Sequence, residues 1–443
     1  MAETSRQTAF TALMRVERDG SYSNIALDMI LSKSSLSQRD KNFVSGIFYG
    51  VIEKCLLLDY NISVYSDIPL NKLDMEIINI LRMGLYQIFF MDSVPASAAV
   101  NETVNLCHGN KFSSAAGFVN GILRSALEYG SLKLPNPKKG KSKFYSVEFS
   151  CPERIVKIWR QSYGDDITRD ILESLDGRPP INARVNTLKT NTDELKKSFE
   201  ESGVNVECSE LSENCLKLSN TGSIEKLPQY RNGLFHIQDT ASQICCKMLD
   251  VHEGQTVLDV CAAPGGKSFT LAQMMNNKGR IISCDLYESR LGLVENGAKR
   301  LSIDIISTVA GDASKISDFP MADRVLCDVP CSGLGIIRRK PELRYKEDLG
   351  IDTLPDIQYL ILCNSAGFVK SGGLLIYSTC TLDPWENNEN ARKFLDEHED
   401  FEPYALKLPD NIKRGIEENE NELTLFPHIN DTDGFFISAF RRK

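Results

Sequence analysis

Long apolar runs are missing from this sequence of 443 residues. A helix needs about 20 consecutive apolar residues to span a bilayer, and no stretch of the chain offers them. The N-terminal segment, residues 1–7, is polar and mixed in charge, so it lacks the basic start and the apolar core of a signal peptide. We therefore expect a cytoplasmic protein that has no membrane partner.

Cysteine pairs at zinc-binding spacing are missing as well. The 13 cysteines are scattered between Cys55 and Cys380, and the pair Cys245-Cys246 is adjacent, which is the wrong spacing for a metal site. Most of these cysteines are expected to be reduced and buried as small hydrophobic side chains. We predict that the protein has no metal site, and we expect a monomer.

An excess of positive charge is the third feature that the sequence lacks. The net charge is -9 and the isoelectric point is about 5.3, whereas phosphate binding needs clustered Lys and Arg. Such clusters do occur locally, in residues 138–143, 338–340 and 441–443. Each cluster alone is typical of a solvated surface, but a local basic track is compatible with an RNA partner whatever the net charge is.

The spacing of apolar residues predicts a helical domain over residues 1–135. Leu73, Ile77 and Leu81 fall on one helical face, and residues 37–40 form a capping-box pattern before a further apolar run. Residues 131–145 are rich in Pro, Gly and Lys, which is typical of a linker. We expect an all-α bundle that ends at this linker.

Two further domains are predicted after the linker. Short strands and helices alternate over residues 146–240, including a helix at 192–202 capped by Thr192, and this pattern indicates a small α+β domain. Strands and helices alternate more regularly over residues 241–443. Successive βαβ units predict an α/β, doubly wound, Rossmann-like domain with a parallel sheet.

A loop that contains two glycines follows the first predicted strand of the third domain and opens a helix. Its residues are Cys261, Ala262, Ala263, Pro264, Gly265, Gly266 and Lys267. The glycines would let the backbone approach a ligand where a Cβ atom would clash. The loop has neither the glycine spacing of a P-loop nor that of the dinucleotide fingerprint, so it does not indicate a pyrophosphate.

Carboxylates stand at successive strand ends of the same domain, at Asp259, Asp285 and Asp312. A carboxylate at the tip of the second strand, Asp285, suits a ribose diol. Asp312 lies where a polar group could meet an adenine edge. One such acid is often a helix cap, but three in register predict a nucleoside ligand without phosphates. S-adenosylmethionine is the common ligand of that kind.

Two cysteines follow the fourth and fifth predicted strands. Cys331 lies in the segment that begins at Asp328, and Cys380 follows Ser378-Thr379. The carboxyl ends of parallel strands meet at one edge of the sheet, so both thiols are expected to face one pocket. A thiolate that adds to carbon 6 of cytosine activates carbon 5 toward a methyl group, and the Asp328 carboxyl group can accept from the cytosine amine. The target base must leave its stack to reach such a pocket. Which cysteine attacks stays open at this point.

These motifs resemble those of the Nol/Nop/Sun family of RNA 5-methylcytosine methyltransferases. The likeness rests on residues 261–267, 328–333, 378–381, 184–187, 238–239, 386–387 and 433–436. The helical region resembles the NusB-like domain of the 16S ribosomal RNA branch of that family, known as RsmB, Sun or Fmu. That likeness rests on residues 38–50, 81–87, 101–104 and 117–121.

The resemblance covers essentially the whole chain and implies a function. It implies that Cys380 is the nucleophile and that Cys331 assists product release. The cofactor, S-adenosylmethionine, would be held by the 261–267 loop together with Asp285, Asp312 and Asp328. The implied substrate is 16S rRNA of the small ribosomal subunit, with cytosine 967 as the target. One departure is the run 338–341, where the family has His or Asn before the proline, and it concerns the fine contacts with RNA.

Two other functions remain open on the sequence. The first is the same chemistry acting on transfer RNA, against which the NusB-like region argues. The second is a non-catalytic RNA-binding factor, against which the two strand-end residues Cys331 and Cys380 argue.

Overall fold

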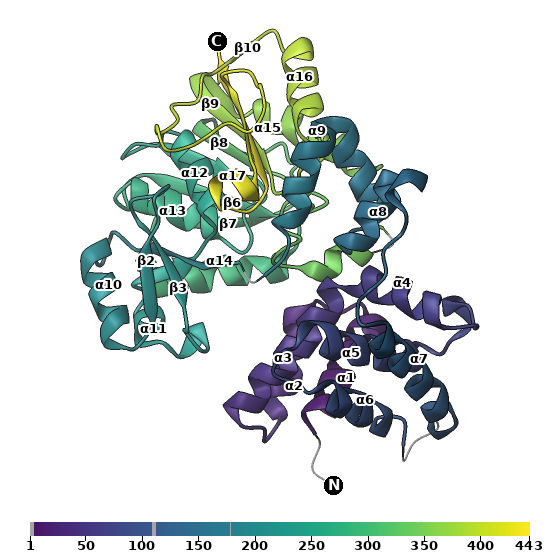
Figure 1. Cartoon of the computed structure of the whole chain (residues 1–443). Helices are drawn as coiled ribbons and strands as arrows, with labels where there is room; N and C mark the ends of the chain where they lie inside the picture. Colours follow the sequence, from purple (N-terminus) through teal and green to yellow (C-terminus); the bar gives the residue numbers. More distant parts are fainter. Residues whose placement is uncertain (1–3, 109–111, 178, 347) are drawn as a thin grey trace. The chain divides into compact units, whose positions relative to one another are not determined.

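The computed structural model describes residues 4–108, 112–177, 179–346 and 348–443, and the chain forms two compact units (Figure 1). The first unit comprises residues 1–176 together with 337–347, and the second comprises 177–336 together with 348–443. The helices of the first unit are α1 (Ser5–Asp19), α2 (Ser23–Lys33), α3 (Gln38–Glu53), α4 (Cys55–Tyr65), α5 (Met75–Phe90), α6 (Ala96–Asn105), α7 (Ala116–Tyr129), α8 (Lys141–Glu148) and α9 (Glu153–Glu173).

The first unit contains the predicted helical bundle. Ser37 caps α3 as expected, because its Oγ accepts from the backbone N–H of Asp40 at 3.2 Å. Ile77 and Leu81 of α5 are buried in the core of the bundle. Helix α5 also packs closely on its neighbours, since a Cβ atom at Gly84 would lie 2.7 Å from the Leu123 side chain.

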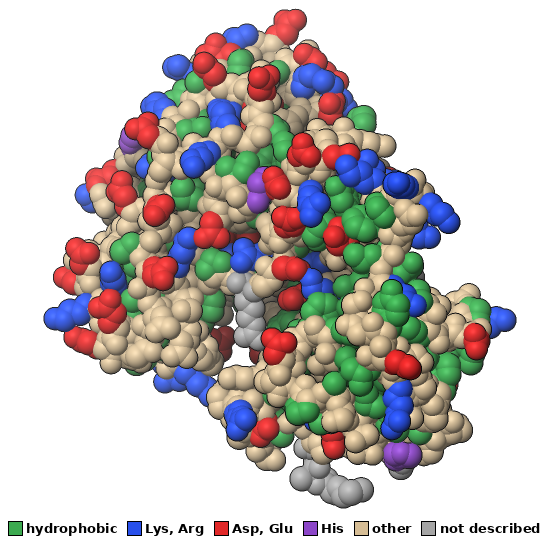
Figure 2. Space-filling view, viewed as in Figure 1, with side chains coloured by type: hydrophobic (Ala, Val, Ile, Leu, Met, Phe, Trp, Pro, Cys, Tyr) green, Lys and Arg blue, Asp and Glu red, His purple; other side chains and the backbone are tan. Residues whose placement is uncertain are grey.

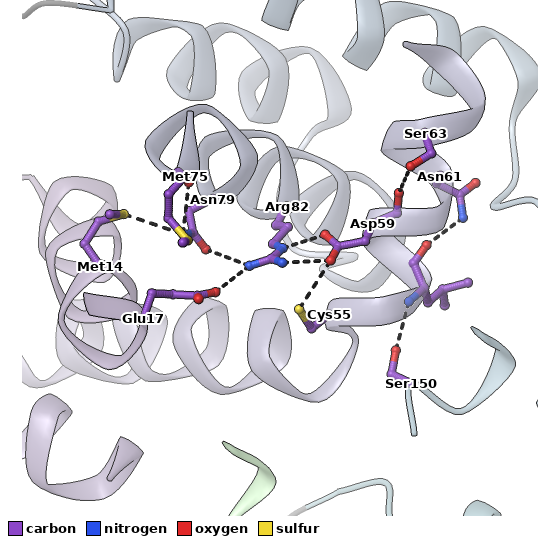
Figure 3. A network of polar contacts seen from close by, with 11 residues as sticks. Met14, Glu17, Cys55, Asp59, Asn61, Ser63, Met75, Asn79, Arg82 and Ser150 are labelled. Carbon is purple, nitrogen blue, oxygen red and sulfur yellow. Dashed lines mark hydrogen bonds and ion pairs between the residues drawn. The ribbon is translucent and has the colours of Figure 1, made fainter. Parts of the chain in front are cut away.

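A network of polar side chains lies inside this bundle (Figure 3). The Arg82 guanidinium group binds the Asp59 carboxylate through two hydrogen bonds, of 2.6 and 2.7 Å. It also donates to Glu17 at 2.6 Å and to the Asn79 side chain at 3.3 Å. Only 8% of Arg82 is exposed, so these partners compensate the cost of burying its charge.

A distant segment completes the first unit. Residues 337–347 belong to it and contain the short 3-10 helix η5 (Pro341–Tyr345). Arg344 is 2% exposed and donates to the carbonyl oxygens of Glu53, Phe149 and Ser150 at 3.2–3.3 Å. Helix α8 also begins within the segment predicted as a linker, because Lys141 and Ser142 contact Asp165 and Arg160. The two compact units do not test the three predicted ranges 1–135, 146–240 and 241–443, which remain a prediction.

The second unit begins with a small antiparallel sheet of order β2-β3-β1-β4. Its elements are β1 (Ile181–Val185), α10 (Thr192–Glu201), β2 (Asn205–Cys208), β3 (Cys215–Ser219), α11 (Pro228–Arg231) and β4 (Phe235–Ile237). Helix α10 lies where it was predicted, but the cap differs from the prediction. Asn191 is the N-cap, because its side chain accepts from the Glu194 N–H at 3.0 Å, whereas the Thr192 hydroxyl donates to the Glu213 carbonyl.

The large sheet has the order β10-β12-β9-β8-β5-β6-β7, and β11 pairs with β12. Its elements are α12 (Thr240–Met248), β5 (Thr256–Asp259), α13 (Gly266–Met274), β6 (Arg280–Asp285), α14 (Glu288–Leu301), β7 (Ile306–Ala310), β8 (Ala322–Asp328), α15 (Leu354–Ala366), β9 (Val369–Thr379), α16 (Asn388–Glu397), β10 (Phe401–Pro403), β11 (Glu422–Leu425), α17 (Pro427–Asn430) and β12 (Phe435–Arg442).

The doubly wound α/β prediction is confirmed, with one addition. Strands β5 to β9 pair in parallel, but β10, β11 and β12 add antiparallel pairs, so the sheet is mixed. Antiparallel neighbours can follow one another without a crossover helix, so a pattern of βαβ units does not predict them. Among the described residues, no helix combines the length and the apolar character needed to cross a membrane.

Candidate active site

The predicted glycine loop joins β5 to α13 at the carboxyl edge of the sheet. Gly265 has a φ of 105°, and a Cβ atom there would lie 2.5 Å from the Phe269 ring. Glycine is therefore required at this position by the backbone and by its neighbour. A Cβ atom at Gly266 would meet nothing closer than the Gln238 side chain at 3.8 Å, so the protein itself leaves room at that position.

Asp285 lies beside this loop at the end of β6. One of its oxygens accepts from the Ala263 N–H at 3.2 Å, and the other accepts from the Tyr287 N–H at 3.1 Å. Arg290, which the sequence did not single out, donates to the Asp285 carboxylate at 3.3 Å and to the Ala263 carbonyl at 2.8 Å. The carboxylate at the second strand tip is thus fixed against the loop, with only 4% of the residue exposed.

Asp312 follows β7 and makes its contacts within its own turn. Its carboxylate accepts from the Ser314 hydroxyl at 2.6 Å and pairs with Lys315 at 2.9 Å. Hydrogen bonds from Ser314 and Lys315 lower the pKa of Asp312 to about 2. Asp312 therefore has a role within its own turn. Its contact with an adenine edge remains a prediction.

Asp259 is a buried acid beneath the loop. One oxygen accepts from the Ser268 hydroxyl at 2.6 Å, and the other is buried without a hydrogen-bond partner among the described residues. Burial raises the pKa of Asp259 to about 7. Asp259 therefore supports the loop from within the protein, whereas Asp285 is the strand-tip carboxylate whose oxygens suit the hydroxyl groups of a ribose.

Asp328 ends β8 and is held from two sides. The Lys267 ammonium group binds one of its oxygens at 2.6 Å, and the Ser378 hydroxyl donates to the other at 2.8 Å. Burial alone would lower the pKa of Lys267, but the charge of Asp328 raises it well above its usual range. The pair therefore links the glycine loop to the ends of β8 and β9.

The two predicted cysteines meet as expected. Strands β8 and β9 pair in parallel with Asp328 opposite Ser378, so the loops that follow them are neighbours. The Cys331 and Cys380 sulfur atoms are 3.0 Å apart, and the Cys380 N–H donates to the Cys331 sulfur at 3.3 Å. The hydrogen bond with Cys380, and then burial, raise the pKa of Cys331 well above its usual range.

Two glycines let a third segment support this pair. Gly335 donates its N–H to the Cys380 carbonyl at 3.0 Å, and Gly434 donates to the Gly335 carbonyl at 2.9 Å. A Cβ atom at Gly335 would lie only 2.0 Å from the Gly434 carbonyl oxygen. Asp433 donates its N–H to Asp239, at 3.2 Å. The 238–239 and 433–436 motifs therefore frame the site.

The turn after Cys380 contains two residues that match the family motifs but to which the sequence assigned no role. Glu386 and Asn387 are both fully buried there. The Asn387 side chain accepts from the Thr379 hydroxyl at 2.5 Å and donates to the Thr381 carbonyl at 3.0 Å. Gln358, which donates to the Glu386 carboxylate at 2.7 Å, gave no signal in the sequence, because a single helical glutamine has no pattern.

The basic clusters are distributed over both units. Residues 138–143 and 338–340 belong to the first unit, and residues 441–443 end the second. On the face shown in Figure 2, acidic and basic side chains are interspersed. In the described part of the chain, no group of His, Cys, Asp and Glu is arranged to hold a metal ion.

Comparison with known proteins agrees with the geometry. A family model described as 16S rRNA methyltransferase RsmB/F matches residues 246–441, a NusB family model matches 3–128, and an RsmF/B-like ferredoxin-like domain matches 151–225. The probable ribosomal RNA small subunit methyltransferase B of Bacillus subtilis is 36% identical over 100% of both chains. The protein of the same name from Synechocystis is 34% identical over 99% of both.

Solved structures share the fold. The crystal structure of PH0851 superposes with a TM-score of 0.82 at 29% identity and covers 98% of both chains. A methyltransferase homolog protein from Pyrococcus horikoshii has a TM-score of 0.60 at 28% identity, covering 69% of this chain and 99% of its own. A methyltransferase family on this doubly wound fold uses S-adenosylmethionine as its cofactor. Identity over the full length shows that this chain belongs to the RsmB/F family of 16S rRNA methyltransferases.

Proposed function

We propose that this enzyme transfers a methyl group to carbon 5 of a cytosine in 16S rRNA, at the position of cytosine 967, through a covalent bond between Cys380 and the base. The observation that carries the proposal is the pair of sulfur atoms of Cys331 and Cys380, 3.0 Å apart at two adjacent strand ends. The names of the relatives support the small-subunit RNA as substrate. We place the enzyme in the cytoplasm, as a monomer.

The nucleophile in this scheme is Cys380. Its thiolate adds to carbon 6 of the cytosine, and the electron pair of the carbon 5–carbon 6 double bond becomes available at carbon 5. The Cys331 thiol is the hydrogen-bond partner of Cys380, and this bond together with burial raises the pKa of Cys331, which makes Cys331 a poor nucleophile. This property of Cys331 supports the assignment that the family resemblance implies.

Release of the product needs a second half-reaction. A base removes the proton from carbon 5, the carbon 5–carbon 6 double bond re-forms, and Cys380 leaves as a thiolate. We assign the assistance of this elimination to Cys331, because its sulfur lies beside the leaving group. Splitting one difficult substitution into addition and elimination is the usual gain of covalent catalysis.

Asp328 is placed to recognise the base, because a carboxylate accepts from the exocyclic amine of cytosine. Lys267 and Ser378 fix its two oxygens and thereby its orientation. The cofactor would be held by Asp285, Asp312, Asp328 and the loop of residues 261–267. Bound S-adenosylmethionine supplies the methyl group as an electrophile.

The test is methyl transfer from labelled cofactor to 16S rRNA, followed by bisulfite sequencing to locate the product. We expect one modified cytosine with the wild-type enzyme and none with Cys380→Ala, while that variant still binds the cofactor. Modification of bulk transfer RNA in place of 16S rRNA would support the transfer RNA alternative. RNA binding without transfer by a folded, cofactor-bound enzyme would indicate the non-catalytic alternative.

A further inference from the structure

Glu386 occupies the turn between β9 and α16, six residues after Cys380, and its side chain is fully buried. The turn around it is anchored, since Thr381, Asp383 and Asn387 are also fully buried. Only Trp385 projects into solvent, with 66% of its surface exposed. A buried carboxylate in such a turn costs free energy unless its contacts repay that cost, which points to a purpose for this side chain.

The contacts of Glu386 lead to the loop of the other cysteine. One carboxylate oxygen accepts from the Ser332 N–H at 2.9 Å and from the Gln358 side chain at 2.7 Å. Gln358 in turn donates to the Pro330 carbonyl at 2.9 Å. Pro330 and Ser332 are the two neighbours of Cys331, so both sides of that cysteine are held through this carboxylate and its amide partner.

The loop of Cys380 is tied to the same point. The Ser332 and Thr381 hydroxyl oxygens are 2.8 Å apart, and Thr381 is the residue that follows Cys380. The Tyr377 hydroxyl of β9 donates to the Glu386 carbonyl at 2.5 Å. Glu386 therefore joins two loops that are 49 residues apart in the sequence at the place where their sulfur atoms meet.

We propose that Glu386 is a positioning residue for product release, which holds the Cys331 loop so that the Cys331 sulfur stays within hydrogen-bonding distance of Cys380. The inference rests on the proposed function, because it assigns the action of Glu386 to the release step through Cys331. The second carboxylate oxygen is buried without a hydrogen bond among the described residues, so the first oxygen makes the bonds to both donors. An amide at this position would keep an acceptor oxygen for the two donors, whereas alanine would remove it.

The first experiment compares Glu386→Ala with Glu386→Gln in steady-state methylation of 16S rRNA. Loss of a hydrogen bond to a charged acceptor predicts a fall in kcat of roughly 10- to 100-fold for Glu386→Ala, with KM values for RNA and cofactor nearly unchanged. Glu386→Gln should recover most of that loss. Glu389→Gln is the matched control, because Glu389 lies in the first turn of α16 and pairs with Arg392 at the surface. A normal kcat for Glu386→Ala, or an equal rise in KM, would overturn the proposal.

The second experiment measures the covalent enzyme–RNA adduct, which survives SDS and disappears with RNase. Glu386→Ala should accumulate it, as Cys331→Ala should. If Glu386 acts through Cys331, the double variant should form and keep adduct as Cys331→Ala does, because the two losses are not additive. Slower adduct formation in the double variant than in Cys331→Ala would mean that Glu386 supports Cys380 or the fold, and would refute the assignment.

The third experiment needs neither RNA nor methyl transfer, so it separates this inference from the proposed function. Iodoacetamide labelling followed by mass spectrometry gives the alkylation rate of Cys331 in each variant. The rates are compared at a temperature equally far below the melting temperature of each protein. A loosened loop should expose Cys331, so Glu386→Ala should be alkylated several-fold faster than wild type, and Glu386→Gln should stay close to wild type. Equal rates in all three proteins would overturn the positioning role even if the enzyme methylates 16S rRNA. If Glu386→Ala does not fold, Glu386→Gln and Gln358→Ala carry the same comparison.

Discussion

The helical unit and the candidate active site surround their buried charged side chains with different kinds of partners. In the helical unit, Arg82 is surrounded by the carboxylates of Asp59 and Glu17 (Figure 3). Beside the glycine loop and the Cys331 loop, Asp259 and Glu386 are buried among hydroxyl and amide donors, with no basic side chain within hydrogen-bonding distance in the described part of the chain. The first arrangement holds a fold together. In the second, burial raises the pKa of both acids, because hydrogen bonds from hydroxyl and amide groups offset the cost of burying a carboxylate only in part.

Breaking the ion pair of the helical unit should give the largest effect on stability. Asp59→Ala leaves the Arg82 charge buried without its main partner, which should cost roughly 3–5 kcal/mol of unfolding free energy. Urea denaturation would measure the loss. The control is Glu173→Ala, because its pair with Arg169 is about half exposed on both sides and should contribute far less to stability. Equal effects of the two variants would mean that the buried network does not stabilise the unit.

Removing the Cys331 thiol of the candidate active site should have the opposite effect, with a large loss of turnover and little change in stability. Cys331→Ala should lower the rate of product release by roughly 100-fold or more, because proton transfer in the elimination loses its assistance. The covalent RNA adduct should accumulate, and the melting temperature should stay close to wild type. Normal turnover without any adduct would remove Cys331 from the mechanism.

The difference between the two regions also explains what the sequence could and could not predict. Cys331 and Cys380 were predictable as neighbours because parallel strands bring their carboxyl ends to one edge, and the structure places their sulfur atoms 3.0 Å apart. The glycine loop and Asp285 followed from the same rule. Gln358 and Arg290 were not predictable, because each acts through one long side chain whose direction depends on packing. The docking of residues 337–347 into the helical unit escaped prediction for a related reason, since a contact with Glu53, 291 residues away, leaves no periodic signal.

Asp285 is a carboxylate that has hydrogen-bond partners within the protein and that is also expected to bind the cofactor. Asp285→Ala should weaken cofactor binding about 10- to 100-fold, the value of a hydrogen bond to a charged group. Isothermal titration calorimetry with S-adenosylmethionine would measure the change. The same variant loses the bond from the Ala263 N–H, so Asp285→Asn, which keeps an acceptor oxygen, is the comparison that separates loop support from ligand binding. An unchanged dissociation constant in both variants would assign Asp285 to the turn alone.

Asp259 should give an effect that appears as a change of stability with pH. Its pKa is about 7 in the folded chain and about 3.9 in an unfolded one, so the folded state keeps the proton over that range. The folded protein therefore loses stability as the pH rises from about 4 to about 7. Asp259→Asn should remove this loss, so its stability relative to wild type should increase between pH 5 and pH 8 in urea denaturation without cofactor. Parallel stability curves would show that the acid is not held protonated.

The place of Arg344 has a consequence for how the chain is made. Residues 337–347 complete the first unit but leave the ribosome after residues 177–336, which belong to the second. Domains usually fold in the order of their synthesis, with the N-terminal one first. Here the carbonyl groups of Glu53 and Ser150 receive their buried arginine only when about three-quarters of the protein has been translated. The unit whose synthesis begins first is thus completed late. Because its residues are divided between 1–176 and 337–347, cleaving the chain at one point cannot release the complete unit.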